Sequence, residues 1–471
     1  MNFLDMMKKK PLLLYLGLLV FGLITSLFII RPHWSLSGEA PFYSYMSIRV
    51  IWLEQVMEQF GDGVWRFEQE GLRDHGEALY FWLALGGRIF GVGYAPLLFF
   101  YAQMGMAIIG LTVFPMLMYR LMKSTVVAVV SPFLVSFFAS RFLWEQKTDI
   151  SWGLSWVMLV GIPLIAILIA EKWTKKSWPI LIVLFFTIAI GNVVRNQAAL
   201  PLLVLAFFTV IPKLFYKVEL RNVKYLIVKN LRLLAAVTLL VMSSDFLTRT
   251  IPFLISPSII GTNIVISRQD QFGPWHTLYI GLGWDAPFEA YGVPDTVNRH
   301  GIIFSDDLGW EHVLRVDSTV VFQSPEYMNI IRNLYFQLWR DDPMFVIDSY
   351  MRKFTANIKM LINHVGNIGT TLYTGPLFAW FAVLLFFKNY DSELSKEPLI
   401  LLFVSVFCAV LGLAQGMVAL PTTIYIMGSL TAIEIGFVAL SILLFRYIIK
   451  YMDLALLTST ESNTSVVINE D

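Results

Sequence analysis

Long runs of apolar residues, separated by short polar segments, make up most of the chain. Each run is about 20 residues long, the length that an α-helix needs to cross the hydrocarbon core of a bilayer. Ten runs have this character: 11–30, 94–119, 124–140, 152–171, 178–194, 198–216, 230–247, 371–388, 398–414 and 422–445. The pattern predicts an all-α polytopic membrane protein with about ten transmembrane helices.

The composition agrees with a membrane location. Apolar residues make up 57% of the chain and charged residues 15%, against about 45–50% and about 25% in soluble domains. A soluble enzyme of this length could not bury so much apolar surface. The net charge is +1, which gives no reason to expect nucleic acid as a partner. Cys408 is the single cysteine, so an intramolecular disulfide and a cysteine-based metal site are both excluded.

The distribution of basic residues orients the predicted spans. A basic segment, 1–10, precedes the first run, and no small-residue cleavage site follows it, so we expect this helix to be retained. With the N-terminus inside, the short inner segments hold 18 basic residues and the short outer loops hold three. By the positive-inside rule, both termini are predicted to be cytoplasmic.

This topology divides the chain into four parts. A transmembrane core of seven spans covers 1–247, including a first outer loop, 31–93, that lies on the membrane surface. A large extracytoplasmic segment follows over 248–370, then three further spans over 371–452 and a disordered cytoplasmic tail over 453–471. Two helices are predicted between Ser324 and Lys359, separated by Asp341-Asp342-Pro343.

Ionisable residues gather on the predicted outer side and are nearly absent from the spans, with Asp245 near the end of the seventh span and Glu434 in the last as exceptions. A pore or pump would place them inside the spans. Glu39 comes shortly before an amphipathic stretch, 43–60, at the lipid–water boundary, where partial desolvation would suit it to act as a general base. The alternative is an ordinary acid at a helix N-terminus.

Three further polar clusters belong to the same side. Asp74 and His75 precede an aromatic run, Asp149 lies in the short loop after the third span, and Arg195 ends the fifth span. The acid and histidine residues are candidates for binding an acceptor or a metal, and the arginine for binding a phosphate. Interfacial loops and a snorkelling arginine are the structural alternatives.

An aromatic segment in the large outer part adds candidates for binding sugar. Trp275 and Tyr279 have side chains that stack on sugar rings, and His276 between them is a candidate for binding or proton relay. Packing within a loop core is the alternative for all three.

In this order, the features resemble GT-C membrane glycosyltransferases, especially the bacterial branch of lipid A aminoarabinose transferase and protein O-mannosyltransferases. The first outer loop of that family carries Asp-x-x-x-Tyr, which Glu39-Ala40-Pro41-Phe42-Tyr43 matches with Glu for Asp. The family then has an acidic or histidine-containing motif before an aromatic run and a Phe-Gly turn, which resembles Asp74-His75 ahead of 80–82 and Ile89-Phe90-Gly91. Its later Asp and Arg are matched by Asp149 and Arg195. The resemblance covers residues 1–250 by motif and the remainder by layout.

The resemblance implies transfer of a sugar from a polyprenyl-phosphate donor to an envelope glycan or lipid-linked acceptor on the extracytoplasmic face. It implies Glu39 as the base, Arg195 at the donor phosphate, and Asp74, His75 and Asp149 as groups that orient the acceptor or hold a divalent metal. One alternative is a polysaccharide polymerase or ligase of the O-antigen type, which needs no carboxylate after the first span. A transporter of a lipid-linked glycan is another, but it would place ionisable groups along its spans.

Overall fold

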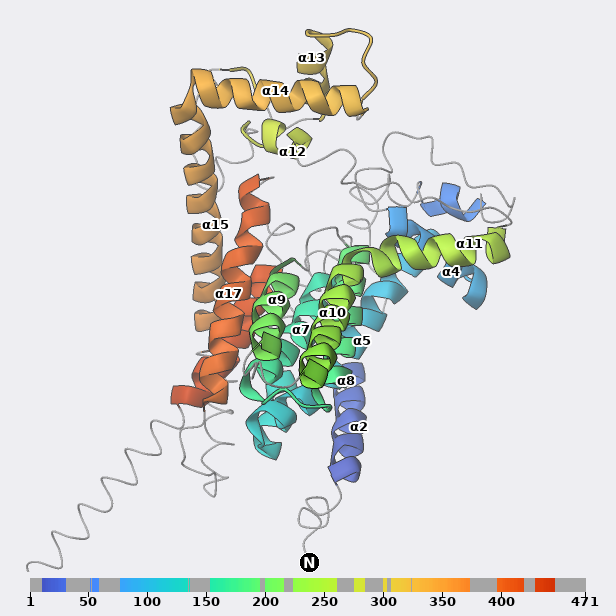
Figure 1. The fold of residues 1–471 in the computed structure, drawn as a ribbon, viewed down its shortest axis with the longest axis vertical. Coiled ribbons are helices and arrows are strands. Elements are labelled where there is room, and N and C mark those ends of the chain that lie inside the picture. Colours follow the sequence, from blue (N-terminus) through green and yellow to red (C-terminus); the bar gives the residue numbers. More distant parts are fainter. Residues whose placement is uncertain are drawn as a thin grey trace, which may run out of the picture.

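The computed structural model describes residues 11–30, 51, 53–58, 77–133, 135, 153–194, 200–215, 223–260, 275–283, 300–302, 306–322, 324–372, 396–418 and 428–444. All regular secondary structure within these ranges is helical (Figure 1). The predicted all-α class is therefore confirmed for the described part of the chain.

The helices follow the apolar pattern closely. In chain order they are α2 (Pro11–Ile30), α4 (Glu77–Phe90), α5 (Ala95–Met122), α7 (Gly153–Ala170), α8 (Ser177–Val194), α9 (Leu200–Phe215), α10 (Val223–Asp245), η4 (Phe246–Thr250), α11 (Ile251–Ile260), α12 (Trp275–Ile280), α13 (Asp306–Leu314), α14 (Pro325–Asp341), α15 (Pro343–Leu372) and α17 (Glu397–Val418). Helical segments also cover 125–133 and Gly428–Leu444.

Among the described helices, four are long and apolar enough to cross a membrane: Leu97–Met122, Ser177–Val194, Leu231–Ile259 and Glu397–Ala414. Five shorter apolar helices accompany them: Leu12–Phe28, Ala78–Phe90, Trp156–Ala170, Leu200–Lys213 and Gly428–Leu444. These helices support a membrane protein, and the count of ten spans stays a prediction.

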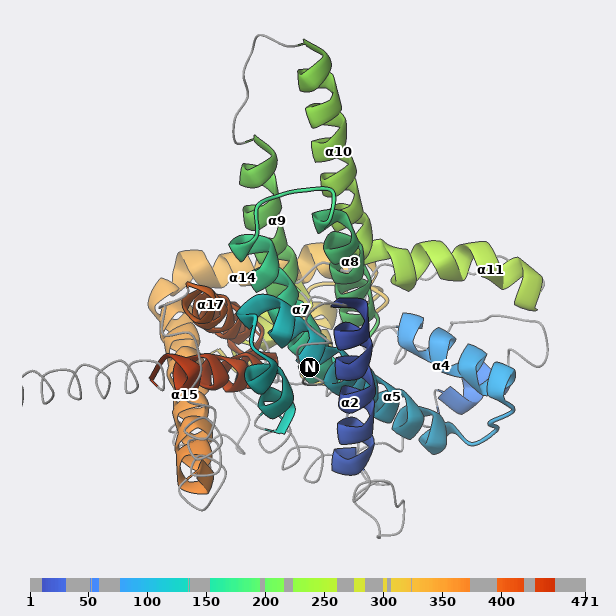
Figure 2. The same cartoon turned by 90° about the horizontal axis from the view of Figure 1, so that it is seen from below.

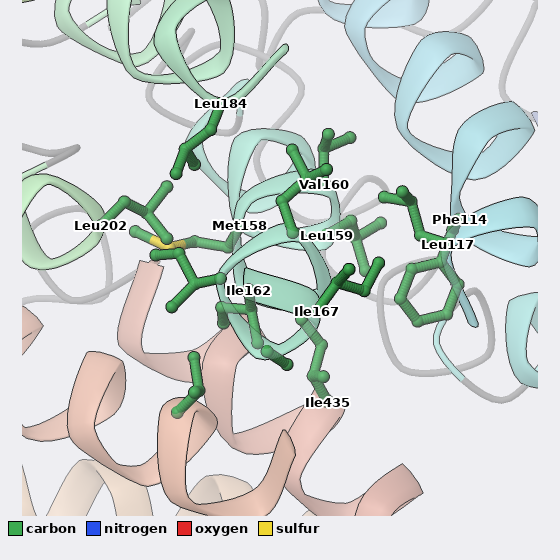
Figure 3. Packing of buried hydrophobic residues seen from close by; sticks show 14 of the residues in the cluster. Phe114, Leu117, Met158, Leu159, Val160, Ile162, Ile167, Leu184, Leu202 and Ile435 are labelled. Carbon is green, nitrogen blue, oxygen red and sulfur yellow. The ribbon is translucent and has the colours of Figure 1, made fainter. Parts of the chain in front are cut away.

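Helix α7 is the centre of the bundle. Its side chains are buried on every side from Trp156 to Leu168, because α5, α8, α9 and α17 surround it (Figure 3). A helix that is apolar all round belongs in a protein core or in membrane hydrocarbon, and α7 is enclosed by other helices. Gly161 permits a close approach of α9, since a Cβ atom there would lie 2.4 Å from the Leu202 side chain.

The first helix packs against α5 through small residues. A Cβ atom on Gly22 would lie 2.4 Å from the Thr112 carbonyl oxygen, so the two backbones approach more closely than a larger residue would allow. Ser26 Oγ lies 3.5 Å from Thr112 Oγ1 at the same contact. Small residues with short hydroxyl groups are typical of contacts between helices in membranes.

Helix α10 does not continue straight into the outer segment. It passes through the π-helical turn η4 into α11, which changes direction and extends sideways from the bundle, beside α4 (Figures 1 and 2). The predicted boundary at 247/248 falls inside η4, and the boundary at 370/371 falls inside α15. Neither boundary coincides with a break in the helical chain.

The helices α12, α13, α14 and the start of α15 pack together at one end of the molecule, and we call them the outer unit. Their core contains Tyr279, Ile331 and Val346. Two helices separated by Asp341-Asp342-Pro343 were predicted here, and α14 and α15 confirm them. Ser324 Oγ caps α14 by accepting from Tyr327 N at 3.1 Å. From the outer unit, α15 extends alongside α17 (Figure 1).

Candidate functional site

Five of the predicted site residues lie outside the residues that the structure describes. They are Glu39, Asp74, His75, Asp149 and Arg195. Their predicted roles stay predictions, and the structural information concerns the segments next to them in the chain.

Those neighbouring segments gather in one hydrophobic cluster, which we call the α4 cluster. It contains Ala78 and Leu79 at the start of α4, close after Asp74 in the sequence, and Val194, the residue before Arg195. Leu53 and Val56, from the amphipathic stretch that follows Glu39, are fully buried in it. The α4 cluster therefore joins segments next to three of the four predicted polar clusters.

Two hydrogen bonds from α4 fix the bend between α10 and α11. Trp82 Nε1 donates to the Leu247 carbonyl oxygen in η4 at 2.7 Å, and Arg88 Nη1 donates to the Ile259 carbonyl oxygen at the end of α11 at 3.0 Å. A π-helical turn and a helix end both leave carbonyl groups without regular partners. Side chains of α4 supply donors at both places.

The end of α8 belongs to the same assembly. Asn192 is buried, and its Nδ2 atom lies 3.5 Å from the Ser243 carbonyl oxygen near the end of α10. Leu247, Ile255 and Ile259 pack against the α4 cluster from η4 and α11. The segment just before Arg195 is therefore held by both α10 and α4.

In the outer unit, the predicted sugar-binding residues occupy the core. His276 and Tyr279 are buried, at 7% and 5% exposure. His276 Nδ1 lies 2.6 Å from the Tyr327 hydroxyl, and Tyr279 OH lies 2.7 Å from His312 Nδ1. Trp275 is half-buried. The structure thus gives His276 and Tyr279 packing partners, while their role in binding sugar stays a prediction.

The electrostatics of this core favour neutral side chains. Burial raises the pKa of Tyr279 to about 12. Burial, with a smaller effect from the Arg315 charge, lowers the pKa of His312. At neutral pH the Tyr279 hydroxyl is therefore protonated and His312 is mostly uncharged, so the hydroxyl can donate to the imidazole. This neutral pair joins α12 to α13.

Trp275 packs between aromatic residues of α14. Its ring centroid lies 5.2 Å from that of Phe336 and 6.1 Å from that of Tyr335. Phe336 and Trp339 on the same helix are exposed, at 48% and 36%. A partly open aromatic surface therefore lies on the side of the outer unit that carries Trp275.

Within the described ranges, no group of three or more His, Cys, Asp or Glu residues is arranged to hold a metal ion. The predicted metal candidates Asp74, His75 and Asp149 lie outside those ranges.

Sequence reasoning missed two buried polar residues, Lys353 and Asn357 on α15. The available signal was their spacing, because they fall on the same helical face as Val346, Met360 and Leu361. The predicted exception Glu434 is also buried, with 1% exposure.

Comparison of the chain with protein-family models, with curated proteins and with solved structures finds no match. The resemblance to the GT-C enzymes therefore rests on the sequence features alone.

Proposed function

We propose that this protein is a membrane glycosyltransferase of the GT-C type. It transfers a sugar from a polyprenyl-phosphate donor to an envelope glycan or lipid-linked acceptor on the extracytoplasmic face of a bacterial inner membrane. In the proposed topology, ten spans cross the membrane, both termini are cytoplasmic, and the α4 cluster and the outer unit lie on the outer side.

The observation that carries this proposal is the position of the α4 cluster. It gathers the described neighbours of Asp74 and Arg195, together with the helix that follows Glu39, around the first turns of α5. Groups that serve one displacement must be brought within a few ångströms of the substrate. A shared cluster of neighbouring segments is what such a site requires.

The charges at the opposite end support the proposed orientation. Helix α5 has 28 residues, so its ends are about 42 Å apart. At the end away from the α4 cluster, Arg120 forms an ion pair with Glu171 at 2.9 Å, and Lys213 donates to carbonyl groups at the end of α7. This basic end corresponds to the cytoplasmic side by the positive-inside rule.

The proposed reaction is a single displacement at the anomeric carbon. The Glu39 carboxylate takes the proton from the acceptor hydroxyl, whose oxygen forms the new bond to the anomeric carbon. The bond between that carbon and the donor phosphate oxygen breaks, and the polyprenyl phosphate leaves with the electron pair. Arg195 offsets the charge that develops on the phosphate. Asp74, His75 and Asp149 orient the acceptor or hold a divalent metal.

The test compares envelope glycans from cells that lack the protein with those from cells carrying the wild type, Glu39→Gln or Glu58→Gln. The amide in Glu39→Gln has the same shape as the carboxylate but does not accept the proton, and loss of a general base lowers rates by about 10²–10⁴. We therefore expect Glu39→Gln to lose the glycan modification. Glu58 is an exposed acid on the following helix and serves as the matched control, expected to behave as the wild type.

Glu39→Asp sharpens this test. The resemblance implies that the shorter acid is accepted here, so part of the activity should remain. Full activity in Glu39→Gln, at equal expression and membrane insertion, would show that Glu39 is only an acid near a helix start. The polymerase or ligase alternative would then become the better explanation.

A further inference from the structure

Helices α4 and α11 extend sideways from the bundle as a pair (Figures 1 and 2). Hydrogen bonds from α4 hold α11 near both of its ends. Trp82 Nε1 donates to the Leu247 carbonyl oxygen just before α11, and Arg88 Nη1 donates to the Ile259 carbonyl oxygen near its end. The two helices therefore form one structural unit that leaves the line of α10.

Neither helix of the pair is long enough to cross a membrane. With 14 and 10 residues, α4 and α11 are about 21 and 15 Å long, whereas the hydrocarbon core is about 30 Å thick. Helix α11 contains no charged residue, and α4 has charges only at Glu77, its first residue, and at Arg88 in its last turn. Short helices of this composition belong in a protein core or within a single leaflet of a membrane.

The pair is not enclosed as a protein core would be. Ile255 and Ile259 on one face of α11 pack against the α4 cluster. On its other face, Phe253 and Leu254 are exposed, at 44% and 61%, and Phe90 at the end of α4 is 80% exposed. A helix on a water-facing surface normally carries polar residues on its open side. These large apolar side chains therefore require an apolar partner.

The end of α10 marks the level of the membrane surface. The stretch 243–250 is polar, and within it Asp245 and Arg249 form an ion pair at 4.0 Å with partly exposed side chains. Charged groups are expected where a span leaves the hydrocarbon. Helix α11 begins at Ile251, directly after this stretch, and turns sideways. It therefore stays close to this level and does not extend away from the membrane.

The exposed apolar surface is also continuous with a lipid-facing surface. Helix α10 belongs to the candidate span Leu231–Ile259 and exposes Val241 and Met242 shortly before the bend. Phe253 and Leu254 carry the same kind of surface past the bend. Acyl chains that cover α10 also cover α11 if the pair lies in the leaflet at this end of the bundle.

We propose that α4 and α11 form an anchor within that leaflet, parallel to the membrane plane, with Phe90, Phe253 and Leu254 in contact with lipid acyl chains. Helices of this kind lie about 5–10 Å deep, at the boundary of headgroups and acyl chains. The anchor displaces lipid from one leaflet only, which brings the lipids of that leaflet up to the α4 cluster. It is independent of sugar transfer by the protein.

The experiment measures the depth of single fluorescent labels. Purified full-length protein with Leu254→Cys or Phe90→Cys, labelled with a nitrobenzoxadiazole maleimide, is reconstituted into vesicles of phosphatidylcholine and phosphatidylglycerol. The vesicles contain a lipid with a nitroxide quencher either near the headgroup or near the end of the acyl chain. We expect the shallow nitroxide to quench both labels about threefold more strongly than the deep one, because both labels lie near the headgroups.

Two matched controls calibrate the depth. Thr238→Cys, exposed near the middle of α10, should be quenched more strongly by the deep nitroxide, and Asp307→Cys, exposed in the outer unit, by neither. Cys408 is buried, so the unmodified protein is the blank. If one labelled variant of the anchor fails to fold, the other decides the matter.

Two results would overturn the anchor. Labels at 254 and 90 that behave like the label at 307 would show that water or protein covers the pair. Stronger quenching by the deep nitroxide at 254 would show that α11 continues α10 across the membrane. Neither result bears on the glycan change expected from Glu39→Gln, so the anchor and the proposed function fail separately.

Discussion

The two ends of the bundle satisfy their helix termini in different ways. At the end that carries Arg120, charged residues of the bundle do so: Lys213 Nζ donates to the carbonyl oxygens of Ile169 and Glu171 at 2.8 and 2.7 Å. It also donates to the Leu168 carbonyl oxygen. At the other end, α4 supplies Trp82 and Arg88 to η4 and α11.

One end is therefore completed by helices of the bundle itself, whereas the other, which we call the assembled end, is built from segments that are distant in sequence. At the basic end, the contacts join neighbouring helices of the bundle, which are closer in sequence than the segments that meet at the α4 end. The α4 end depends on α4 and on the bend between α10 and α11, so segments far apart in sequence must meet there. An end assembled from distant segments is the natural place for a binding site, because each segment contributes its own side chains.

The largest expected effect is a qualitative difference in labelling. Asp307→Cys lies in the outer unit and Lys175→Cys at the basic end, and both positions are exposed. In intact spheroplasts a membrane-impermeant maleimide should label Asp307→Cys alone, and Lys175→Cys should react only after permeabilisation. The native Cys408 is buried, so the unmodified protein is the blank. The opposite result would reverse the orientation and with it the proposed function.

Lys213→Met tests how far the basic end depends on one side chain. It removes a donor shared by three carbonyl groups at the end of α7, and we expect a loss of about 2 kcal/mol in unfolding free energy. The measurement is unfolding of the detergent-solubilised protein. Lys213→Arg keeps donors at this place and should recover most of the loss, whereas Lys176→Met, at an exposed lysine nearby, should change little.

Trp82→Phe tests the assembled end. It keeps the ring but removes the hydrogen bond to the Leu247 carbonyl oxygen, with an expected loss of about 1 kcal/mol. The effect should also appear as faster amide hydrogen exchange in η4 and α11, with α7 unaffected. Uniform exchange across the bundle would mean that α4 does not hold the bend.

Glu171→Gln should have the smallest effect. The ion pair with Arg120 is partly exposed, with side chains at 28% and 34% exposure, and pairs of this kind contribute about 0.5 kcal/mol. The same unfolding measurement applies, at low and high salt. A loss as large as that of Lys213→Met would show that the ion pair, and not the capping of α7, holds the basic end together.

The helices of the bundle were predictable where one continuous apolar run forms one helix. The predicted 178–194 corresponds to Ser177–Val194, and 398–414 falls within Glu397–Val418. Length and hydropathy determine such helices directly. Helix α11 was missed because the seventh span was ended in the polar stretch 243–250, and the apolar residues 251–260 that follow are too few to be predicted as a span of their own.

The candidate site was less predictable for a different reason. Glu39, Asp74 and Arg195 could be proposed from the motif, but the meeting of their neighbouring segments depends on contacts between α4, α8 and α10. The burial of Lys353 also depends on tertiary packing. A lysine in a predicted outer helix is normally solvated, and although Lys353 shares a helical face with Val346 and Met360, its full burial depends on the helices that pack against α15.

The π-helical turn η4 sets the direction of α11 relative to α10. A π turn accommodates one more residue than an α turn. Deleting one residue within Phe246–Thr250 would remove this extra residue and favour a regular α-helix that continues in the direction of α10. The ten residues of α11 would then extend about 15 Å past the bundle, and Arg88 would lose its acceptor. A single codon deletion here would therefore redirect α11 without changing any residue of α10 or α11.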